Sequence, residues 1–155
     1  MYVFDTNVFI LLGQYYPSRF PTIWAKIDEL ADNDVLRSVK EVRRELEQYN
    51  AASHISEWVR AHSALFLPPT EDEMCVVAEI FRKEQYRGFV KRSNLLKGMP
   101  VADPFVVAAG KVHSRKVVTQ EADKAGAARI PTACREFGVK CMTVEEFLEL
   151  ENLKY

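Results

Sequence analysis

Short apolar stretches alternate with longer amphipathic ones along this chain of 155 residues, and this alternation limits the possible folds most strongly. The short stretches are expected to be strands at 2–4, 35–38, 116–119 and 139–142. The longer stretches repeat apolar residues every three or four positions, which predicts helices. Strands that alternate with helices favour a parallel sheet covered on both faces, so we expect an α/β fold.

The helices are expected where helical periodicity coincides with capping residues. Thr70 and Glu73 have the spacing of a capping box, and Thr143 is expected to cap the last helix. Asp103 is interpreted as the N-cap of a buried helix whose first residue is Pro104. The expected helices lie at 8–12, 21–33, 39–49, 55–64, from 71 to about 81, 105–112 and 143–150.

Length and composition indicate one globular domain over 1–155, with 48% hydrophobic and 28% charged residues. The three cysteines are odd in number and form no CxxC pair, which argues against a disulfide framework and a zinc site. The apolar start is too short for a membrane span and lacks the basic residues of a signal peptide. We therefore expect a cytoplasmic protein without a membrane segment.

The formal net charge is −1, which counts mildly against a dedicated nucleic-acid-binding protein. Basic residues nevertheless gather between positions 82 and 97, where Glu84 is the one acid. Such a segment can bind phosphates, or it can be a solvated helix face, and the sequence leaves both interpretations open. The basic residues are Arg82, Lys83, Arg87, Lys91, Arg92 and Lys97.

Acidic residues follow the ends of the expected strands. Asp5 comes directly after the first strand, and Glu121 follows the strand at 116–119, with Asp123 two positions beyond. Asp103 stands at the start of a helix. In open parallel sheets, sites gather beyond the carboxyl ends of the strands. The alternative for Asp5 and Asp103 is simple helix capping.

Glu45 adds an acid on a neighbouring helix, one turn after Glu41. Either glutamate can instead be a solvated acid paired with a neighbour such as Arg44 or Lys40. Bringing several carboxylates together out of water costs several kcal/mol unless cations neutralise them. Hard divalent cations such as Mg²⁺ or Mn²⁺ prefer oxygen ligands, so a metal site is the predicted role of this cluster.

Four segments resemble the PIN-domain nucleases in the order in which that family has them. These are VFDTNV at 3–8, VRREL at 42–46, ADPFVVAAG at 102–110 and VVTQEAD at 117–123. The resemblance runs from residue 2 to about residue 147. It implies a three-layer α/β/α sandwich with a central parallel sheet, and endonuclease activity on single-stranded RNA with Mg²⁺ or Mn²⁺.

The resemblance also implies roles for individual residues. Asp5, Glu45 and Asp103 would be metal-binding acids. Glu121 would take the fourth acidic place, which is usually Asp, and Asp123 could share or replace its role. The polar residues that would steady these carboxylates are Thr6, Asn7 and Thr119.

Small PIN-domain proteins are often toxins of toxin–antitoxin pairs, so the resemblance implies an antitoxin partner and a homodimer. An arginine of the antitoxin that reaches the carboxylates would silence such an enzyme. A haloacid-dehalogenase-type hydrolase would need a second acid where this chain has Asn7, and a dinucleotide-binding protein would need a glycine-rich first turn. A catalytically silent PIN-like binding or scaffold module stays open as the alternative.

Overall fold

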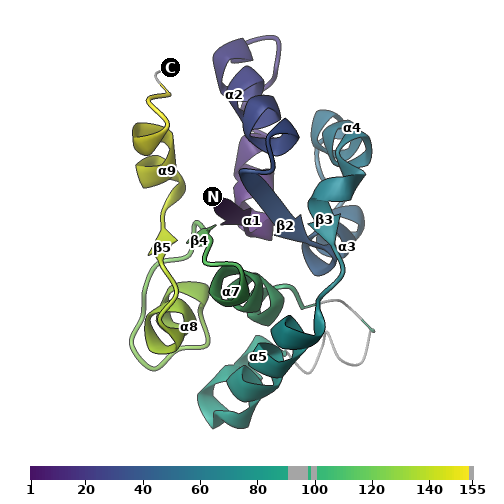
Figure 1. The fold of residues 1–155 in the computed structure, drawn as a ribbon. Helices are drawn as coiled ribbons and strands as arrows, with labels where there is room; N and C mark the ends of the chain where they lie inside the picture. Colours follow the sequence, from purple (N-terminus) through teal and green to yellow (C-terminus); the bar gives the residue numbers. More distant parts are fainter. Residues whose placement is uncertain (91–97, 99–100, 154–155) are drawn as a thin grey trace.

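A five-stranded parallel sheet forms the centre of the protein in the computed structural model, which describes residues 1–90, 98 and 101–153. Its strand order is β3-β2-β1-β4-β5, so the first strand is the middle one (Figure 1). The strands are β1 (Tyr2–Phe4), β2 (Leu36–Val39), β3 (Phe66–Leu67), β4 (Lys116–Val118) and β5 (Cys141–Met142). The expected α/β fold with a central parallel sheet is confirmed.

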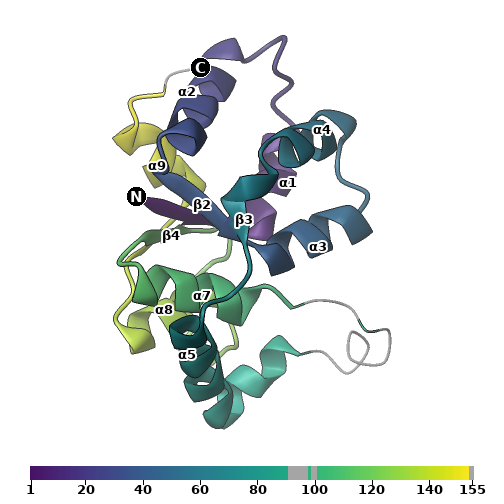
Figure 2. The same ribbon diagram turned by 45° about the vertical axis from the view of Figure 1, so that its right-hand side comes forward.

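Helices cover both faces of the sheet. Figures 1 and 2 show α5, α7 and α8 below it, and α1, α2, α4 and α9 above it. The α-helices are α1 (Thr6–Leu12), α2 (Pro21–Asp32), α3 (Lys40–Gln48), α4 (Ser53–Ala61), α5 (Glu71–Arg82), α7 (Asp103–Val112), α8 (Ile130–Phe137) and α9 (Val144–Leu150). Within the described residues, 3₁₀ helices form at η1 (Ser63–Leu65), between α4 and β3, and at η2 (Glu84–Phe89), after α5.

The core is built on both sides of β1, whose residues are all buried. Successive strand residues point to opposite faces. The ring of Phe4 contacts Phe147 of α9 edge to face, with 5.0 Å between centroids, and lies 5.8 Å from Phe9 of α1. On the other face, the buried helix α7 contacts β1, β2 and β4. β1 is thereby fixed in the middle of the molecule, and Asp5 follows it directly.

The sequence predicted most elements to within a few residues. The strand at 2–4 is confirmed, and Thr70 and Thr143 each form the capping box that opens α5 and α9. One assignment at a helix start is wrong. Ala102, not Asp103, is the N-cap of α7, and Asp103 is its first residue, followed by Pro104.

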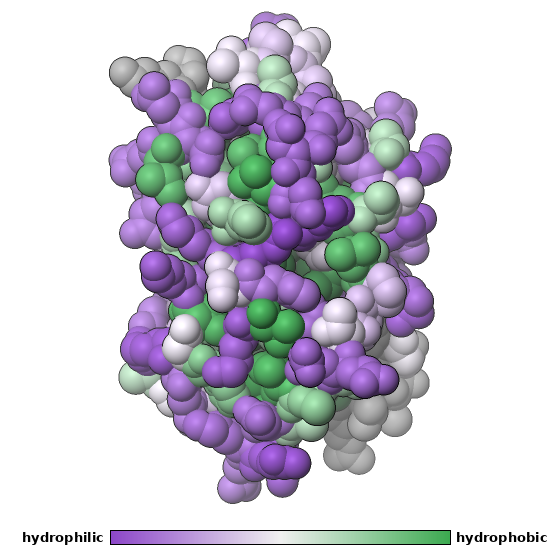
Figure 3. All heavy atoms as spheres, viewed as in Figure 1, coloured by the Kyte–Doolittle hydropathy of each residue, from purple (hydrophilic) through white to green (hydrophobic). Residues whose placement is uncertain are grey.

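The surface mixes polar and apolar residues. On the face drawn in Figure 3, hydrophilic residues surround small hydrophobic patches. No helix within the described ranges has the length and hydropathy needed to cross a bilayer. In the part of the chain that the structure describes, the exposed large hydrophobic residues come from separate elements and loops: Met1, Tyr16, Tyr49, Leu67, Met74 and Leu150.

Candidate metal-binding site

Asp5 lies at the carboxyl edge of the sheet and is 1% exposed. Its side chain makes no capping hydrogen bond to α1, although the residue holds the N-cap position. The hydroxyl of Thr119 donates to Oδ2 of Asp5 at 2.8 Å, and Asn7 Nδ2 lies 3.4 Å from the same oxygen. The capping interpretation of this carboxylate is therefore wrong, and its side chain points to the end of β4 instead.

Glu45 links two other parts of the predicted cluster. Its Oε2 accepts a 2.5 Å hydrogen bond from the hydroxyl of Thr6, the residue after Asp5. Its Oε1 accepts from the backbone N–H of Ala102 at 2.9 Å. Ala102 precedes Asp103, which is half-buried at the start of α7. Glu45 is thus not a solvated acid paired with a neighbour, because it holds together the starts of α1 and α7.

Thr119 connects Asp5 with the fourth acidic position. It is buried, and its hydroxyl oxygen accepts from the backbone N–H of Glu121 at 3.1 Å. The carboxylate of Glu121 accepts from the backbone N–H of Ile130 at 2.8 Å, at the first residue of α8. An acid at a helix N-terminus is favoured by the helix dipole. Glu121 is therefore anchored between the end of β4 and the start of α8.

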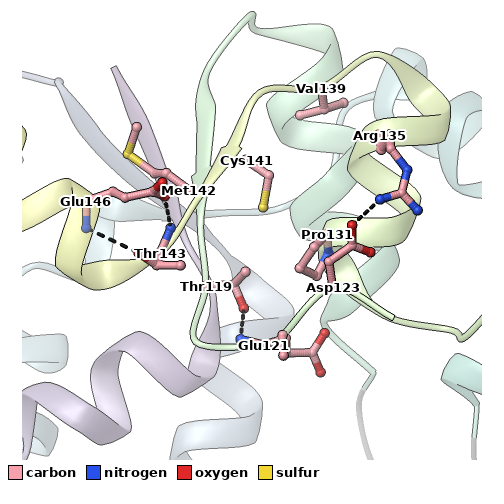
Figure 4. A pocket seen from close by; sticks show the side chains of 11 residues that line it. Thr119, Glu121, Asp123, Pro131, Arg135, Val139, Cys141, Met142, Thr143 and Glu146 are labelled. Atoms are coloured by element: carbon pink, nitrogen blue, oxygen red, sulfur yellow. Dashed lines mark hydrogen bonds and ion pairs between the residues drawn. The ribbon is translucent and has the colours of Figure 1, made fainter. Parts of the chain in front are cut away.

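Asp123 has different partners. Its carboxylate accepts from the hydroxyl of Thr132 at 3.1 Å and forms an ion pair with Arg135 (Figure 4). Because Arg135 already compensates its charge, Asp123 is the less suitable of the two acids for neutralising a cation. Glu121, rather than Asp123, is therefore hydrogen-bonded to Thr119, the residue that donates to Asp5.

The electrostatics of this edge are dominated by burial and by like charges. Burial raises the pKa of Asp5 to about 7; the hydrogen bond from Thr119 opposes this shift, whereas the negative charges of Glu121 and Glu45 add to it. Burial also raises the pKa of Glu45, against the hydrogen bonds from Thr6 and Ala102. The charges of Glu121 and Glu45 are thus close enough to destabilise the charged form of Asp5.

The donor chemistry of the edge fits a hard divalent cation, since its acids offer only carboxylate oxygens. A bound cation would also relieve the repulsion that raises the pKa of Asp5. Among the residues that the structure describes, however, no three His, Cys, Asp or Glu side chains are grouped closely enough to hold a metal ion. The carboxylates would have to converge for a cation to bind.

Glu41 is a buried acid that the sequence did not single out beyond its place one helical turn before Glu45. It is 8% exposed, and its Oε2 is buried without a hydrogen-bond partner. Helical spacing indicated that the two glutamates share one side of α3. Burial could not be read from that spacing, because it depends on the elements packed around the helix.

The predicted basic segment is only partly within the described residues. Lys83 pairs with Glu136, and its amine lies 5.1 Å from the centroid of the Phe137 ring. Arg82 and Arg87 are exposed. The remaining three basic residues, Lys91, Arg92 and Lys97, lie outside the described residues. Binding of RNA by this segment stays a prediction.

Comparisons with known proteins give a structural likeness and a family. The crystal structure of FitAcB from Neisseria gonorrhoeae is similar, with a TM-score of 0.52, and the match covers 92% of this chain and 96% of that chain. At 17% identity this likeness concerns the fold alone. A comparison with curated proteins gave no match. The family described as "Domain of unknown function (DUF4411)" matches residues 2–155, and the chain therefore belongs to the DUF4411 family.

Proposed function

We propose that this protein is a divalent-metal-dependent endoribonuclease that hydrolyses single-stranded RNA. The observation that carries the proposal is the buried carboxylate of Asp5, whose pKa is raised further by the charges of Glu45 and Glu121. Unbalanced negative charge at the ligand edge of a parallel sheet favours a cation. The order of the four acidic segments resembles that of the PIN-domain nucleases, and the fold likeness to FitAcB is compatible with this resemblance.

In this proposal, Asp5, Glu45, Asp103 and Glu121 bind Mg²⁺ or Mn²⁺ and are the catalytic acids. A bound ion of this kind activates water and stabilises negative charge on a phosphate. Thr119 orients Asp5 through the hydroxyl that donates to Oδ2. The other polar positions act in the same way: Thr6 holds Glu45, and Asn7 lies beside Asp5.

On the PIN resemblance we also propose a cytoplasmic toxin that forms a homodimer and is silenced by an antitoxin. An arginine of that partner would form charge-assisted hydrogen bonds with the carboxylates. Co-purification with the product of a neighbouring reading frame, followed by loss of cleavage on mixing, would support this role. Full activity in the presence of every co-purifying protein would contradict it.

The proposed activity is tested with purified protein and single-stranded RNA in Mg²⁺ or Mn²⁺. We expect cleavage that EDTA abolishes and that Asp5→Asn and Glu45→Gln reduce to background. Glu47→Gln is a matched control, because Glu47 lies on the same helix but is exposed and pairs with Arg43. Cleavage that persists in EDTA or in both site variants would rule out the metal mechanism.

A catalytically silent binding module is the second candidate. It is favoured by the finding that the described acids do not form a group of three close metal ligands. Such a module would bind RNA or protein but leave every RNA intact, even when saturated with Mn²⁺ and free of partners. Mn²⁺ binding measured by calorimetry separates the two candidates further, since only the nuclease requires it.

A further inference from the structure

A cavity of about 470 Å³ lies beside the acidic edge, between the end of β4, β5, α8 and the start of α9 (Figure 4). This volume is in the range of ordinary small-ligand sites. Much of its wall is apolar and comes from Ala122, Pro131, Val139, Cys141 and Met142. The cavity therefore offers a hydrophobic surface directly next to a strongly polar site.

The cavity adjoins the proposed metal site, because Glu121 lines it. Thr119 lines it and also donates to the carboxylate of Asp5. A second, more open hollow of about 550 Å³ is lined by Asn7 and Arg129, and the two hollows share Glu121 and Ala122. A chain-like ligand that crosses the acidic edge would therefore meet one hollow on each side of Glu121.

The charges around the first cavity select against a phosphate group. Its charged lining consists of three carboxylates and the guanidinium of Arg135, which already pairs with Asp123. Uncompensated negative charge therefore remains on Glu121 and Glu146, and it would repel an anion. A neutral, flat ring with polar edges suits such a wall better.

Hydrogen-bonding groups at the rim can meet the edge of such a ring. The hydroxyl oxygen of Thr143 accepts from the backbone N–H of Glu146 at 3.2 Å, which leaves its proton for an acceptor. Oε2 of Glu146 accepts from the backbone N–H of Thr143 at 2.7 Å, and both residues are exposed. The rim thus offers one donor and carboxylate acceptors beside an apolar surface.

We propose that this cavity binds one unpaired base of the RNA strand, next to the phosphate that is cut. The proposal rests on the proposed function, because it takes the strand across the acidic edge. The base packs on Pro131 and Ala122, while the backbone continues past Glu121 toward Arg129, whose guanidinium suits the next phosphate. A base held in a duplex cannot enter the cavity, so the subsite favours single strands.

The first test does not depend on cleavage. Protein labelled with ¹³C on the alanine methyl groups is titrated in EDTA with a short single-stranded RNA, and with the same RNA lacking its bases. We expect the intact RNA to shift the Ala122 signal through the ring current of the base, and the abasic RNA to leave it unchanged. Ala125, which is exposed and lines neither hollow, is the internal control. An unshifted Ala122 signal at saturating RNA would overturn the proposal.

The second test uses a pair of variants in one loop. Ala122→Trp fills the boundary between the hollows, whereas Ala125→Trp adds the same ring at an exposed position that lines neither of them. We expect Ala122→Trp to weaken RNA binding by about tenfold or more, as loss of one stacked base would. Equal affinities of the two variants would contradict the subsite.

The outcomes separate this inference from the proposed nuclease activity. If intact RNA shifts the Ala122 signal of the wild-type protein but the protein cuts no RNA in Mn²⁺, the base subsite stands and the nuclease proposal fails. If the protein cuts RNA while the Ala122 signal and the Ala122→Trp variant behave as their controls do, the nuclease stands and the base subsite fails.

Discussion

Asp5 shows how far one residue can be understood from sequence. Its position after an apolar strand predicted the carboxyl edge, but capping and metal binding explained an acid there about equally well. In the structure the carboxylate accepts from Thr119 and makes no side-chain capping hydrogen bond to α1, and metal binding stays a proposal. The resemblance to PIN-domain nucleases implied that Thr119 steadies the carboxylates. The pairing of β1 with β4 shows that it binds Asp5, which lies 114 residues away in the chain.

The stability of the metal-free protein should depend on pH through Asp5. Its pKa of about 7 in the folded protein is above the value of about 4 expected in the unfolded chain. Such a group stabilises the fold fully below the unfolded pKa, and this contribution is lost as pH rises through the folded pKa. We expect Asp5→Asn to be the more stable protein at pH 7.5 in EDTA, by a few kcal/mol at most.

Urea unfolding of both proteins between pH 4.5 and pH 7.5 tests this expectation. The difference in unfolding free energy should move in favour of Asp5→Asn as pH rises. A difference that stays constant across this range would mean that Asp5 does not titrate there.

Thr119→Val should weaken metal binding without removing a proposed ligand. Valine keeps the shape of the side chain but takes away the hydroxyl that donates to Asp5 and accepts from Glu121 N. Loss of a group that orients metal ligands typically costs about 10–100-fold in affinity or activity. Calorimetric titration with Mn²⁺ measures the effect. Thr70→Val, on α5 away from the site, is the control; equal losses in both variants would indicate a general effect of unfolding.

At the scale of elements, helices were predictable where they are long or carry a capping box. α8 was missed, since its eight residues offer barely two turns of periodicity. β3 was missed because it has two residues and exists only through its pairing with β2. β5 is shorter than the strand expected at 139–142. Short elements of this kind depend on neighbours that lie far away in sequence, which local patterns do not contain.

Gly110→Ala should destabilise the protein, although alanine is the better helix former. An added Cβ would lie 2.6 Å from Cγ2 of Val117 and 2.8 Å from Cγ1 of Val139, so α7 could not keep its distance from the sheet. Overpacking of this kind costs about 1–3 kcal/mol, more than the gain of up to about 1 kcal/mol in helix propensity. A denaturant midpoint at or above that of the wild type would contradict the close packing of α7.

For the whole molecule, the sequence predicted that Asp5 and Glu121 follow β1 and β4 at the carboxyl edge of the sheet, near Glu45 and Asp103. It could not predict how they are tied together, because the hydrogen bonds of Glu45 reach Thr6 and Ala102, 39 and 57 residues away. The sequence also left open whether Glu121 or Asp123 takes the fourth acidic position. It depends on Arg135 and Ile130, which belong to the helix that was missed.

Divalent cations should stabilise the whole fold. A ligand that binds only the folded state adds about 2.7 kcal/mol at one hundred times its Kd. We expect Mn²⁺ to raise the melting temperature of the wild-type protein at pH 7.5, and to have little effect on Asp5→Asn or Asp103→Asn. A rise of equal size in all three proteins would mean that the cation binds elsewhere.

The central place of β1 has a consequence for how the protein is made. During translation Asp5 leaves the ribosome long before Thr119, yet the carboxylate gains this partner only when β4 takes its place beside β1. The site therefore cannot form in the nascent chain until contacts of long sequence separation are made, and such contacts form slowly. An enzyme of the proposed kind would therefore be harmless to the messenger RNA from which it is being translated.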